Sequence, residues 1–507
     1  MAFSPPSREE ILKLKLRFDR HTFKNTKVNS GLIKNKNGTL LPYSTNDSSS
    51  SCTSNYVPGS TALSIKQIYT AAQFNNSEDR PFQTPPIIAV VDYNAAVNLQ
   101  SSMDTFCQNN NISSTTLNII PIENPPSTTD GEQYADTQLI HSFCINGIIL
   151  VIQAESSSIQ DMAVAIEVAK TYNPNIINMS WSVDESSFSQ SEYDNLSEIF
   201  TGDIIYCASS GDYGTSYVSW PASDPNVVGV GATSLVLNSN NTIKSQVTWS
   251  CSGCGPSQFA KQPLYQSLVN TGTSYRATPD ISFNGNPYSG MELIINGEAE
   301  TIGGSSVAAP MMSGYFALVN GYLLNIGRSL FNSIATSPDC IQTLLYSAVN
   351  QENYNTLFFD VTEGNVGQYN AKEGWDYPSG CGTIFAIPMF EYLTGYNPSG
   401  DDESSNNFDP MGEVENDSNQ VQQQTSSASE IVLLPSLWPN AFPRPLTSQN
   451  TCIRTYIFKD GTKIEKFLDY VNKTFPNRKV DIKQLDDGKV SVSLTDISLN
   501  QTTNNDS

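Results

Sequence analysis

Residues 147–181, GIILVIQAESSSIQDMAVAIEVAKTYNPNIINMSW, decide the fold class. The run 147–153 is short, apolar and rich in β-branched residues, which is typical of a buried strand. In 158–172 the apolar residues recur at helical spacing, and 175–181 is a second apolar run. A strand, an amphipathic helix and another strand in this order predict a parallel pair joined by a crossover helix.

Similar apolar runs occur before and after this unit. They are PPIIAVVDY (85–93), DIIYCASS (203–210) and NVVGVGAT (226–233). We therefore predict an α/β fold, with a doubly wound, mostly parallel sheet that helices cover on both faces. Sites in such sheets gather at the carboxyl ends of the strands, so candidate residues are sought there.

The chain is strongly acidic. Its 507 residues include 50 Asp and Glu against 27 Lys and Arg, which gives a net charge of −23. This charge argues against nucleic acid or an anionic membrane as the main partner. It favours either simple solubility or work at low pH. No stretch of 18 apolar residues occurs, so we expect no membrane span. Charges interrupt residues 1–18, so we expect no signal peptide. We also expect the protein to be a monomer. Particle association and delivery to an acidic compartment both stay open.

Composition divides the chain into four parts. Residues 1–55 are expected to be a polar N-terminal extension, and 56–396 a large globular domain. Residues 397–450 have the composition of an acidic, disordered linker. The sequence pattern of the last part, 451–498, predicts a small α+β module of unknown role, with a β-hairpin over 479–494.

The cysteines do not indicate a metal site. There are nine, an odd number, and Cys251 and Cys254 form the only closely spaced pair. The chain has two histidines, and neither is near this pair, so we predict no zinc site. We expect mainly structural thiols, and an oxidised pair stays open.

The segment TIGGSSVAAPMMSG (301–314) carries the strongest local signal for chemistry. Two glycines lead into Ser305 and Ser306, and an apolar helical run follows. This order places a hydroxyl on a sharp turn at a helix N-terminus, where backbone N–H groups stabilise negative charge. A nucleophilic serine needs such a position, although a Gly/Ser loop that merely packs a helix has the same pattern.

A nucleophilic serine also needs a base. His21 lies in the polar extension, and His141 lacks the surroundings of a subtilase base. Glu132 and Asp136 lie at i and i+4, and therefore share one helix face. Two carboxylates this close raise the pKa of one of them and can share a proton, as two groups that act together as a general base must do. The alternative is a solvated acidic helix face.

A third candidate, Asp212, lies in CASSGDYG (207–214) at the end of an apolar run. A side-chain donor to a developing oxyanion is worth roughly 10²–10³ in rate. A carboxyl group can donate only while it is protonated. The alternative is a turn aspartate, which is common before glycine.

Taken together, these segments resemble the sedolisin family, the serine-carboxyl peptidases with a subtilisin-like fold. GGSSVAAP is similar to the family's GGTSA-x-x-P motif and implies Ser306 as nucleophile. The E-x-x-x-D helix implies Glu132 as base with Asp136 as its partner, and the SGD motif implies Asp212 as oxyanion donor. The resemblance covers roughly residues 56–396, with the motifs in the family's order.

The resemblance implies a serine-type peptidase acting on protein or peptide substrates through an acyl-enzyme. It is an endopeptidase or a tripeptidyl-peptidase. Because carboxyl groups do all the acid–base work, we expect an optimum at about pH 3–5, judged from ordinary carboxyl pKa values.

The resemblance also implies a calcium site. FFDVTEGNVGQYNAKEGWDYPSGCGT (358–383) is similar to the family's calcium loop. Two carboxylates and three carbonyl oxygens would bind one Ca²⁺ ion, a set of ligands that suits this hard cation. They belong to Asp360, Asp376, Val361, Lys372 and Gly374.

One departure favours a different function. The family is made with a long folding pro-domain, whereas 55 residues precede the match here. The alternative is therefore a catalytically inactive protein that keeps the sedolisin fold for a structural or binding role. The complete set of catalytic residues argues against this alternative. An ordinary subtilase, which uses a histidine as its base, is disfavoured because neither histidine of the chain lies in suitable surroundings.

Overall fold

The structure of the protein is a computed structural model. It describes residues 3–19, 26–30, 32–42, 52–74 and 82–396, together with three strands near the C-terminus. The predicted linker at 397–450 lies outside the described residues.

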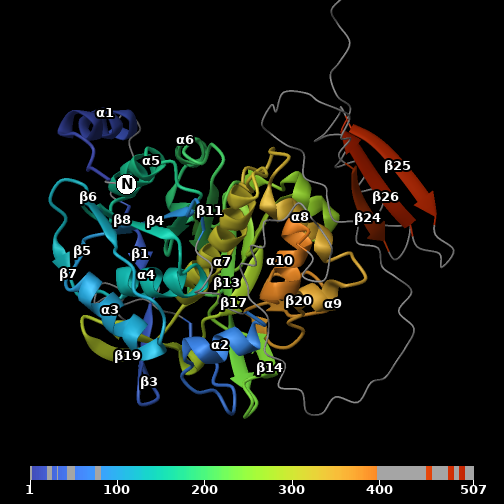
Figure 1. Ribbon diagram of the computed structural model, residues 1–507, viewed down its shortest axis with the longest axis horizontal. Coiled ribbons are helices and arrows are strands. Elements are labelled where there is room, and N and C mark those ends of the chain that lie inside the picture. Colours follow the sequence, from blue (N-terminus) through green and yellow to red (C-terminus); the bar gives the residue numbers. More distant parts are fainter. Residues whose placement is uncertain are drawn as a thin grey trace, which may run out of the picture.

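An eight-stranded sheet forms the centre of the molecule (Figure 1). Its order is β14-β13-β11-β9-β4-β8-β6, with β17 also paired to β13. Only the β13–β14 pair is antiparallel, so the prediction of a doubly wound, mostly parallel sheet is confirmed. The strands are β4 (Ile87–Tyr93), β6 (Asn118–Pro121), β8 (Ile148–Ala154), β9 (Ile176–Met179), β11 (Ile205–Ser209), β13 (Val228–Leu237), β14 (Ile243–Thr248) and β17 (Ile281–Asn284).

Each central strand contributes to two hydrophobic cores. In β4, Ile88 and Val90 belong to one buried cluster, and Ala89 and Val91 to the other. Successive side chains of a strand point to opposite faces, so the two clusters lie on the two faces of the sheet. This explains why the strands read as continuous apolar runs in the sequence.

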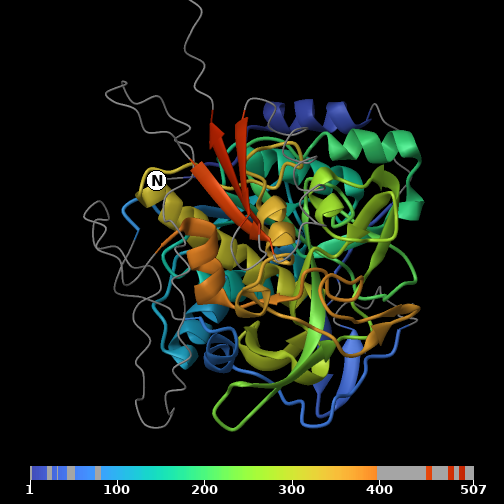
Figure 2. The same cartoon turned by 90° about the vertical axis from the view of Figure 1, so that its right-hand side faces the viewer.

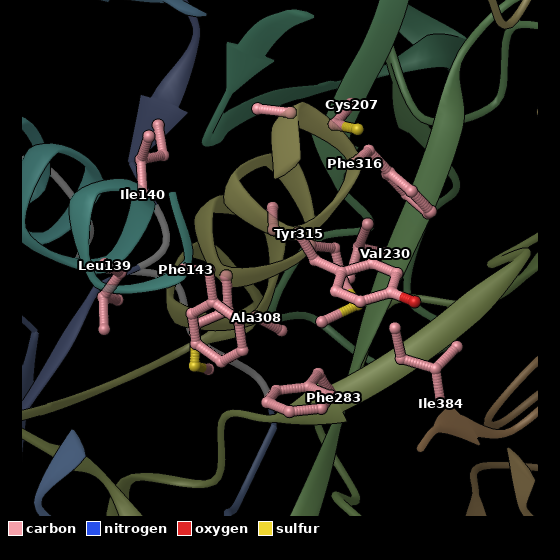
Figure 3. Packing of buried hydrophobic residues seen from close by; sticks show 14 of the residues in the cluster. Leu139, Ile140, Phe143, Cys207, Val230, Phe283, Ala308, Tyr315, Phe316 and Ile384 are labelled. Carbon is pink, nitrogen blue, oxygen red and sulfur yellow. The ribbon is translucent and has the colours of Figure 1, made fainter. Parts of the chain in front are cut away.

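Two helices lie together on the face that carries the candidate site. They are α4 (Glu132–Phe143) and α7 (Ser305–Asn325), and their apolar side chains interdigitate (Figure 3). They approach closely at Gly314, where a Cβ atom would lie 2.6 Å from the carbonyl oxygen of Ile140. Of the described helices, α7 alone is long and apolar enough to span a membrane, but 94% of its apolar window is buried in the fold.

The opposite face is covered by α5 (Ile159–Lys170) and α1 (Arg8–Asp19). Helix α1 packs on α5 and buries Ile11 and Phe18 in the core of this face. In the turned view, α1 is the blue helix that runs along the top of the molecule (Figure 2).

Further residues of the N-terminal segment pair with distant strands. Strand β1 (Asn29–Ser30) pairs with β10 (Trp181–Asp184), and β2 (Ile33–Lys36) pairs with β19 (Glu298–Gly303). The short β3 (Thr39–Pro42) extends the second pairing, because it pairs with β2. The segment expected to be an extension therefore contributes strands to sheets of the globular domain.

The cysteines include one disulfide. It joins Cys52 to Cys251 across 199 residues of sequence. Cys254, the sequence neighbour of Cys251, is a buried thiol, as are the other described cysteines outside the disulfide.

Three antiparallel strands are described near the C-terminus. They are β24 (Ile453–Phe458), β25 (Arg478–Gln484) and β26 (Val490–Asp496), with β26 in the middle. The pairing of β25 with β26 confirms the predicted hairpin at 479–494. The helical part of the predicted α+β module lies outside the described residues.

Candidate active site

The expected catalytic residues meet at the carboxyl edge of the central sheet. Ser180 directly follows β9, and Asp212 lies three residues after β11. Glu132 is the first residue of α4, and Ser306 is the second residue of α7. Strand ends and helix N-termini thus bring together residues that lie up to 174 positions apart in the sequence.

Asp212 contacts the start of α7 through Ser305. The backbone N–H and the hydroxyl of Ser305 each donate to Oδ1 of Asp212 at 2.7 Å. The N–H of Gly211 donates to the Ser305 hydroxyl at 3.1 Å. Gly304, the residue before the helix, has φ 123° and ψ 163°, a conformation that essentially only glycine adopts. This glycine sets the sharp turn that the sequence predicted.

Ser306 and Asp136 share one neighbour, Ser180. The hydroxyl of Ser306 donates to the carbonyl oxygen of Ser180 at 2.8 Å. The hydroxyl of Ser180 donates to Oδ1 of Asp136 at 2.5 Å. Ser180 therefore links the expected nucleophile to the expected carboxylate pair, and all three residues are fully buried.

Glu132 is held by the N-terminal segment. Its Oε2 accepts a hydrogen bond from the hydroxyl of Ser30, and its side chain is buried, with the residue only 2% exposed. Its Oε1 has no hydrogen-bond partner in the part of the chain that the structure describes. In the same part of the chain no hydrogen bond joins Glu132 to Ser306, so the expected base does not contact the expected nucleophile directly in this structure.

The carboxyl groups of the site are strongly perturbed. Burial raises the pKa of Glu132 well above its ordinary value, and the charges of Asp136 and Asp92 raise it further. Burial likewise raises the pKa of Asp136 well above its ordinary value, and that of Asp92 to about 7. Buried carboxylates this close favour states in which at least one of them keeps its proton.

Sequence reasoning missed two residues of this site. Ser180 has a recognisable signal, because it lies at the carboxyl end of the strand predicted at 175–181. Ser30 has none, because it contacts Glu132 across 102 positions of sequence. Of the two histidines, His141 bonds through Nε2 to the carbonyl oxygen of Ser113 at 2.7 Å, and His21 lies outside the described residues.

The candidate calcium loop brings its two carboxylates together. Asp360 accepts a hydrogen bond from the backbone N–H of Gly374, and Asp376 accepts one from that of Lys372. Burial raises the pKa of Asp376 to about 6, and the nearby charge of Asp360 adds to this.

The backbone of this loop supplies further oxygens. Among the described residues, the carbonyl oxygens of Val361, Lys372 and Gly374 accept no backbone hydrogen bond. Among the described residues, no group of three or more His, Cys, Asp or Glu side chains is arranged so that it could hold a metal ion. Carboxylates and backbone carbonyl oxygens are the ligand types that a hard cation such as Ca²⁺ prefers.

Comparison with known proteins gives consistent matches over this region. The model of the subtilase family, peptidase S8, matches residues 139–386. Sedolisin of Pseudomonas sp. (strain 101) is 30% identical over 200 residues, which are 36% of this chain and 31% of the relative. Kumamolisin of Bacillus sp. (strain MN-32) is 25% identical over 302 residues, 53% of this chain and 51% of the relative.

Tripeptidyl-peptidase 1 of Dictyostelium discoideum is a further relative. It is 27% identical over a match that covers 44% of this chain and 39% of the relative. The chain thus spans about a third to a half of the length of these curated relatives. Among solved structures, the serine-carboxyl proteinase sedolisin of Pseudomonas, in complex with pseudo-iodotyrostatin, has a TM-score of 0.58 and 24% identity. It covers 66% of this chain and 99% of the solved one, which supports the subtilisin-like fold. The chain is therefore similar in sequence to sedolisin and kumamolisin over about a third to a half of its length, and it has the subtilisin-like fold.

Proposed function

We propose that this protein is a serine-carboxyl peptidase that hydrolyses peptide bonds, with Ser306 as nucleophile. The observation that carries the proposal is the convergence of three buried carboxyl groups on the start of one helix. These groups belong to Glu132, Asp136 and Asp212. Three acidic side chains gathered beside adjacent serines are costly to bury, so a purely structural role gives no reason for them.

In the first step of the proposed mechanism, Ser306 attacks the carbonyl carbon of the scissile bond. Glu132 accepts the hydroxyl proton, and Asp136, close to Glu132 on the next helical turn, shares the proton. The hydroxyl of Ser306 must turn from the Ser180 carbonyl toward Glu132 for this transfer.

The negative charge that develops on the substrate oxygen needs donors. Protonated Asp212 and the backbone N–H of Ser306 donate to it, and the N-terminus of α7 adds a favourable dipole. Glu132 then returns its proton to the leaving amine, and an acyl-enzyme on Ser306 remains. Water attacks this ester, passes its proton to Glu132, and releases the acid while Ser306 regains its proton.

The proposed substrates are proteins or peptides bound in extended form, at acid pH. An endopeptidase and a tripeptidyl-peptidase differ in their need for a free substrate amine. Paired peptides with a free or an acetylated N-terminus distinguish them, since acetylation stops only the tripeptidyl-peptidase.

We further propose that the loop over 358–383 binds one Ca²⁺ ion. Asp360 and Asp376 would supply charge, and the carbonyl oxygens of Val361, Lys372 and Gly374 would complete the oxygen ligands. The ion would stabilise the loop by neutralising two nearby carboxylates, one of which is mostly buried. It takes no part in the chemical steps.

Labelling with a peptide aldehyde tests the peptidase proposal, because an aldehyde forms a hemiacetal with an active serine. We expect an adduct on Ser306 at about pH 4 to 5, located by mass spectrometry of proteolytic fragments. The matched control is Ser306→Ala, which keeps the fold and removes the hydroxyl. If the protein binds the peptide but forms no adduct at any pH, the result would support the alternative of a catalytically inactive protein with the same fold.

A further inference from the structure

One asparagine lies in the middle of the central sheet. Asn178 is the third residue of β9, preceded by two isoleucines and followed by a methionine, and its side chain is fully buried. Strand β9 is an inner strand, because β4 and β11 pair with it on either side. Burial of a side-chain amide is costly unless the amide forms hydrogen bonds. The partners of Asn178 therefore indicate what this residue does.

The side chain of Asn178 points to the face of the sheet that carries the candidate site. In β9, Ile176 belongs to the core that packs under α4 and α7, whereas Ile177 and Met179 belong to the core of the opposite face. Because side chains alternate along a strand, Asn178 points to the same side as Ile176. The amide is thus directed toward the two helices that carry the expected base and the expected nucleophile.

Three hydrogen bonds join α7, β9 and α4 through this amide. The hydroxyl of Ser313, on α7, donates to Oδ1 of Asn178 at 2.8 Å. Nδ2 of Asn178 donates to the hydroxyl oxygen of Ser180 at 2.9 Å, and that hydroxyl donates to Oδ1 of Asp136 at 2.5 Å. All four residues are fully buried. We call Ser313, Asn178 and Ser180 the buried polar chain.

The order of donors gives the buried polar chain a direction. An amide nitrogen only donates, so the oxygen of Ser180 accepts from Asn178, and the single proton of this hydroxyl is left for Asp136. The hydroxyl of Ser313 occupies Oδ1 of Asn178, which keeps the amide nitrogen turned toward Ser180. Hydrogen bonds in a buried chain of this kind strengthen one another. The chain therefore delivers to Asp136 a hydroxyl donor whose orientation is fixed from behind.

This donor acts on one oxygen of the carboxylate pair. Oδ1 of Asp136 accepts from Ser180. Oδ2 of Asp136 and Oε1 of Glu132 have no hydrogen-bond partner within the part of the chain that the structure describes. A hydrogen bond donated to a carboxylate favours its ionised form. The arrangement thus favours ionisation at Oδ1 of Asp136 and leaves the other two oxygens for a shared proton.

The rest of the surroundings opposes ionisation of the pair. Burial raises the pKa of Asp136 well above its ordinary value, and the charge of Asp92 on β4 adds to this. The charges of Asp92 and Asp212 also raise the pKa of the glutamate of the pair, after burial and its aspartate partner. Against these effects, hydrogen bonds from Ser180 and Asn178 lower the pKa of Asp136.

We propose that Asn178 is a positioning residue for the expected base, because it holds the hydroxyl of Ser180 on Asp136 and thereby sets which oxygens of the carboxylate pair carry the shared proton. Ser313 supports it from α7 by fixing the amide. This inference rests on the proposed function for the role of the pair. It does not require the chain to hydrolyse peptide, because the ionisation of the pair is measured without catalysis.

The test replaces the amide by an apolar side chain. Asn178→Val suits a strand and removes both hydrogen bonds of the amide. The matched control is Asn320→Val, because Asn320 is also a fully buried asparagine, whose Oδ1 and Nδ2 bond to the backbone of Phe331 at 2.9 and 3.0 Å. Ser313→Ala is a milder second variant, which removes only the donor to the amide. All three changes are made in the full chain carrying Ser306→Ala.

The ionisation of the pair is followed by the infrared absorption of protonated carboxyl groups as the pH is raised. The same measurement on a chain with Asp136→Asn identifies the band of the pair. We expect Asn178→Val to move the midpoint of this band up by about half a pH unit, a roughly threefold change in proton affinity, because the ionised form loses an oriented donor. Ser313→Ala should move the midpoint in the same direction by less. Asn320→Val should leave the midpoint in place, even where its Tm falls as far as that of Asn178→Val.

A midpoint that stays in place in Asn178→Val, or in Ser313→Ala where Asn178→Val does not fold, overturns the proposal. An equal shift in Asn320→Val overturns it too. In chains with Ser306 intact, the acid limb of kcat/KM should move up by the same amount as the midpoint. If the midpoint shifts as expected but no chain hydrolyses peptide, the positioning role stands and the peptidase function is wrong. If peptide is hydrolysed and the midpoint does not shift, the peptidase function stands and the positioning role is wrong.

Discussion

The hydroxyl of Ser305 donates to Oδ1 of Asp212 at 2.7 Å, whereas the hydroxyl of its neighbour Ser306 donates to the carbonyl oxygen of Ser180 at 2.8 Å. Two adjacent serines at one helix start thus have different partners. Ser305 holds the expected oxyanion donor, and Ser306 lies beside the residue that contacts Asp136. This division supports a positioning role for Ser305 and the proposed nucleophilic role of Ser306.

Separate substitutions of the two serines test this division. Ser306→Ala should abolish peptide hydrolysis, because it removes the attacking oxygen while a small residue still fits the helix start. Ser305→Ala should lower kcat by roughly fivefold, since one side-chain hydrogen bond of about 1 kcal/mol to Asp212 is lost. The backbone N–H of residue 305 still reaches Asp212 in that variant. Activity that survives Ser306→Ala but not Ser305→Ala would mean that the nucleophile is the earlier serine.

The dependence of activity on pH should have two limbs with separate causes. Glu132 must be ionised to accept a proton, and burial together with Asp136 and Asp92 raises its pKa. The acid limb of kcat/KM should therefore lie above pH ~4.3, the ordinary value for glutamate. The optimum then falls toward the upper end of the pH range of about 3–5 expected from unperturbed carboxyl groups.

The alkaline limb should report the loss of the Asp212 proton. An ionised carboxylate repels the oxyanion, whereas an amide donates at every pH. Asp212→Asn should therefore move the alkaline limb upward, even if the peak rate falls by a factor on the order of 10². The measurement is kcat/KM from pH 3 to pH 8 for both chains. An alkaline limb that stays in place in Asp212→Asn would assign it to another group.

Removal of calcium should lower thermal stability. A cation that binds only the folded chain stabilises it by mass action. A chelator should lower the Tm of the parent chain, and added Ca²⁺ should restore it. Asp376→Asn should have a low Tm that neither chelator nor Ca²⁺ changes. If the parent has the same Tm with and without chelator, the loop over 358–383 is not a calcium site.

The sheet was predictable from the sequence because its signals are local. The run 147–153 became β8, and the helical spacing in 158–172 became α5, with boundaries that differ by one or two residues. Glu132 and Asp136 were found in the same way, since their spacing and the helix that carries them lie in one short segment.

Strands β1 and β2 were not predictable, because their signals are not local. They contain only two and four residues, too few for a periodic pattern, and their partners lie more than 150 positions away. The same holds for the disulfide, since nothing near Cys52 in the sequence indicates Cys251. The two short strands form because distant strands pair with them and because Glu132 accepts a hydrogen bond from Ser30.

The buried carboxyl groups should make the folded chain more stable in acid than at neutral pH. The pKa of Asp92 is raised by burial from 3.8 to about 7, and that of Asp224 to about 6. The folded state thus binds these protons more tightly than the unfolded chain does. Their contribution to stability is fully present below about pH 4 and is lost as the pH rises through 6 and 7.

We therefore expect the Tm to fall from pH 5 to pH 8, with a change in the free energy of unfolding on the order of 2–4 kcal/mol. Asp92→Asn should flatten this dependence, because an amide is neutral at every pH. The control is Asp203→Asn, a change at an exposed aspartate that should leave the slope of the parent intact. Thermal unfolding at half-unit pH steps measures all three chains. A Tm that rises between pH 5 and pH 8 in the parent would show that these carboxyl groups are ionised in the folded state and that the site is built for neutral pH.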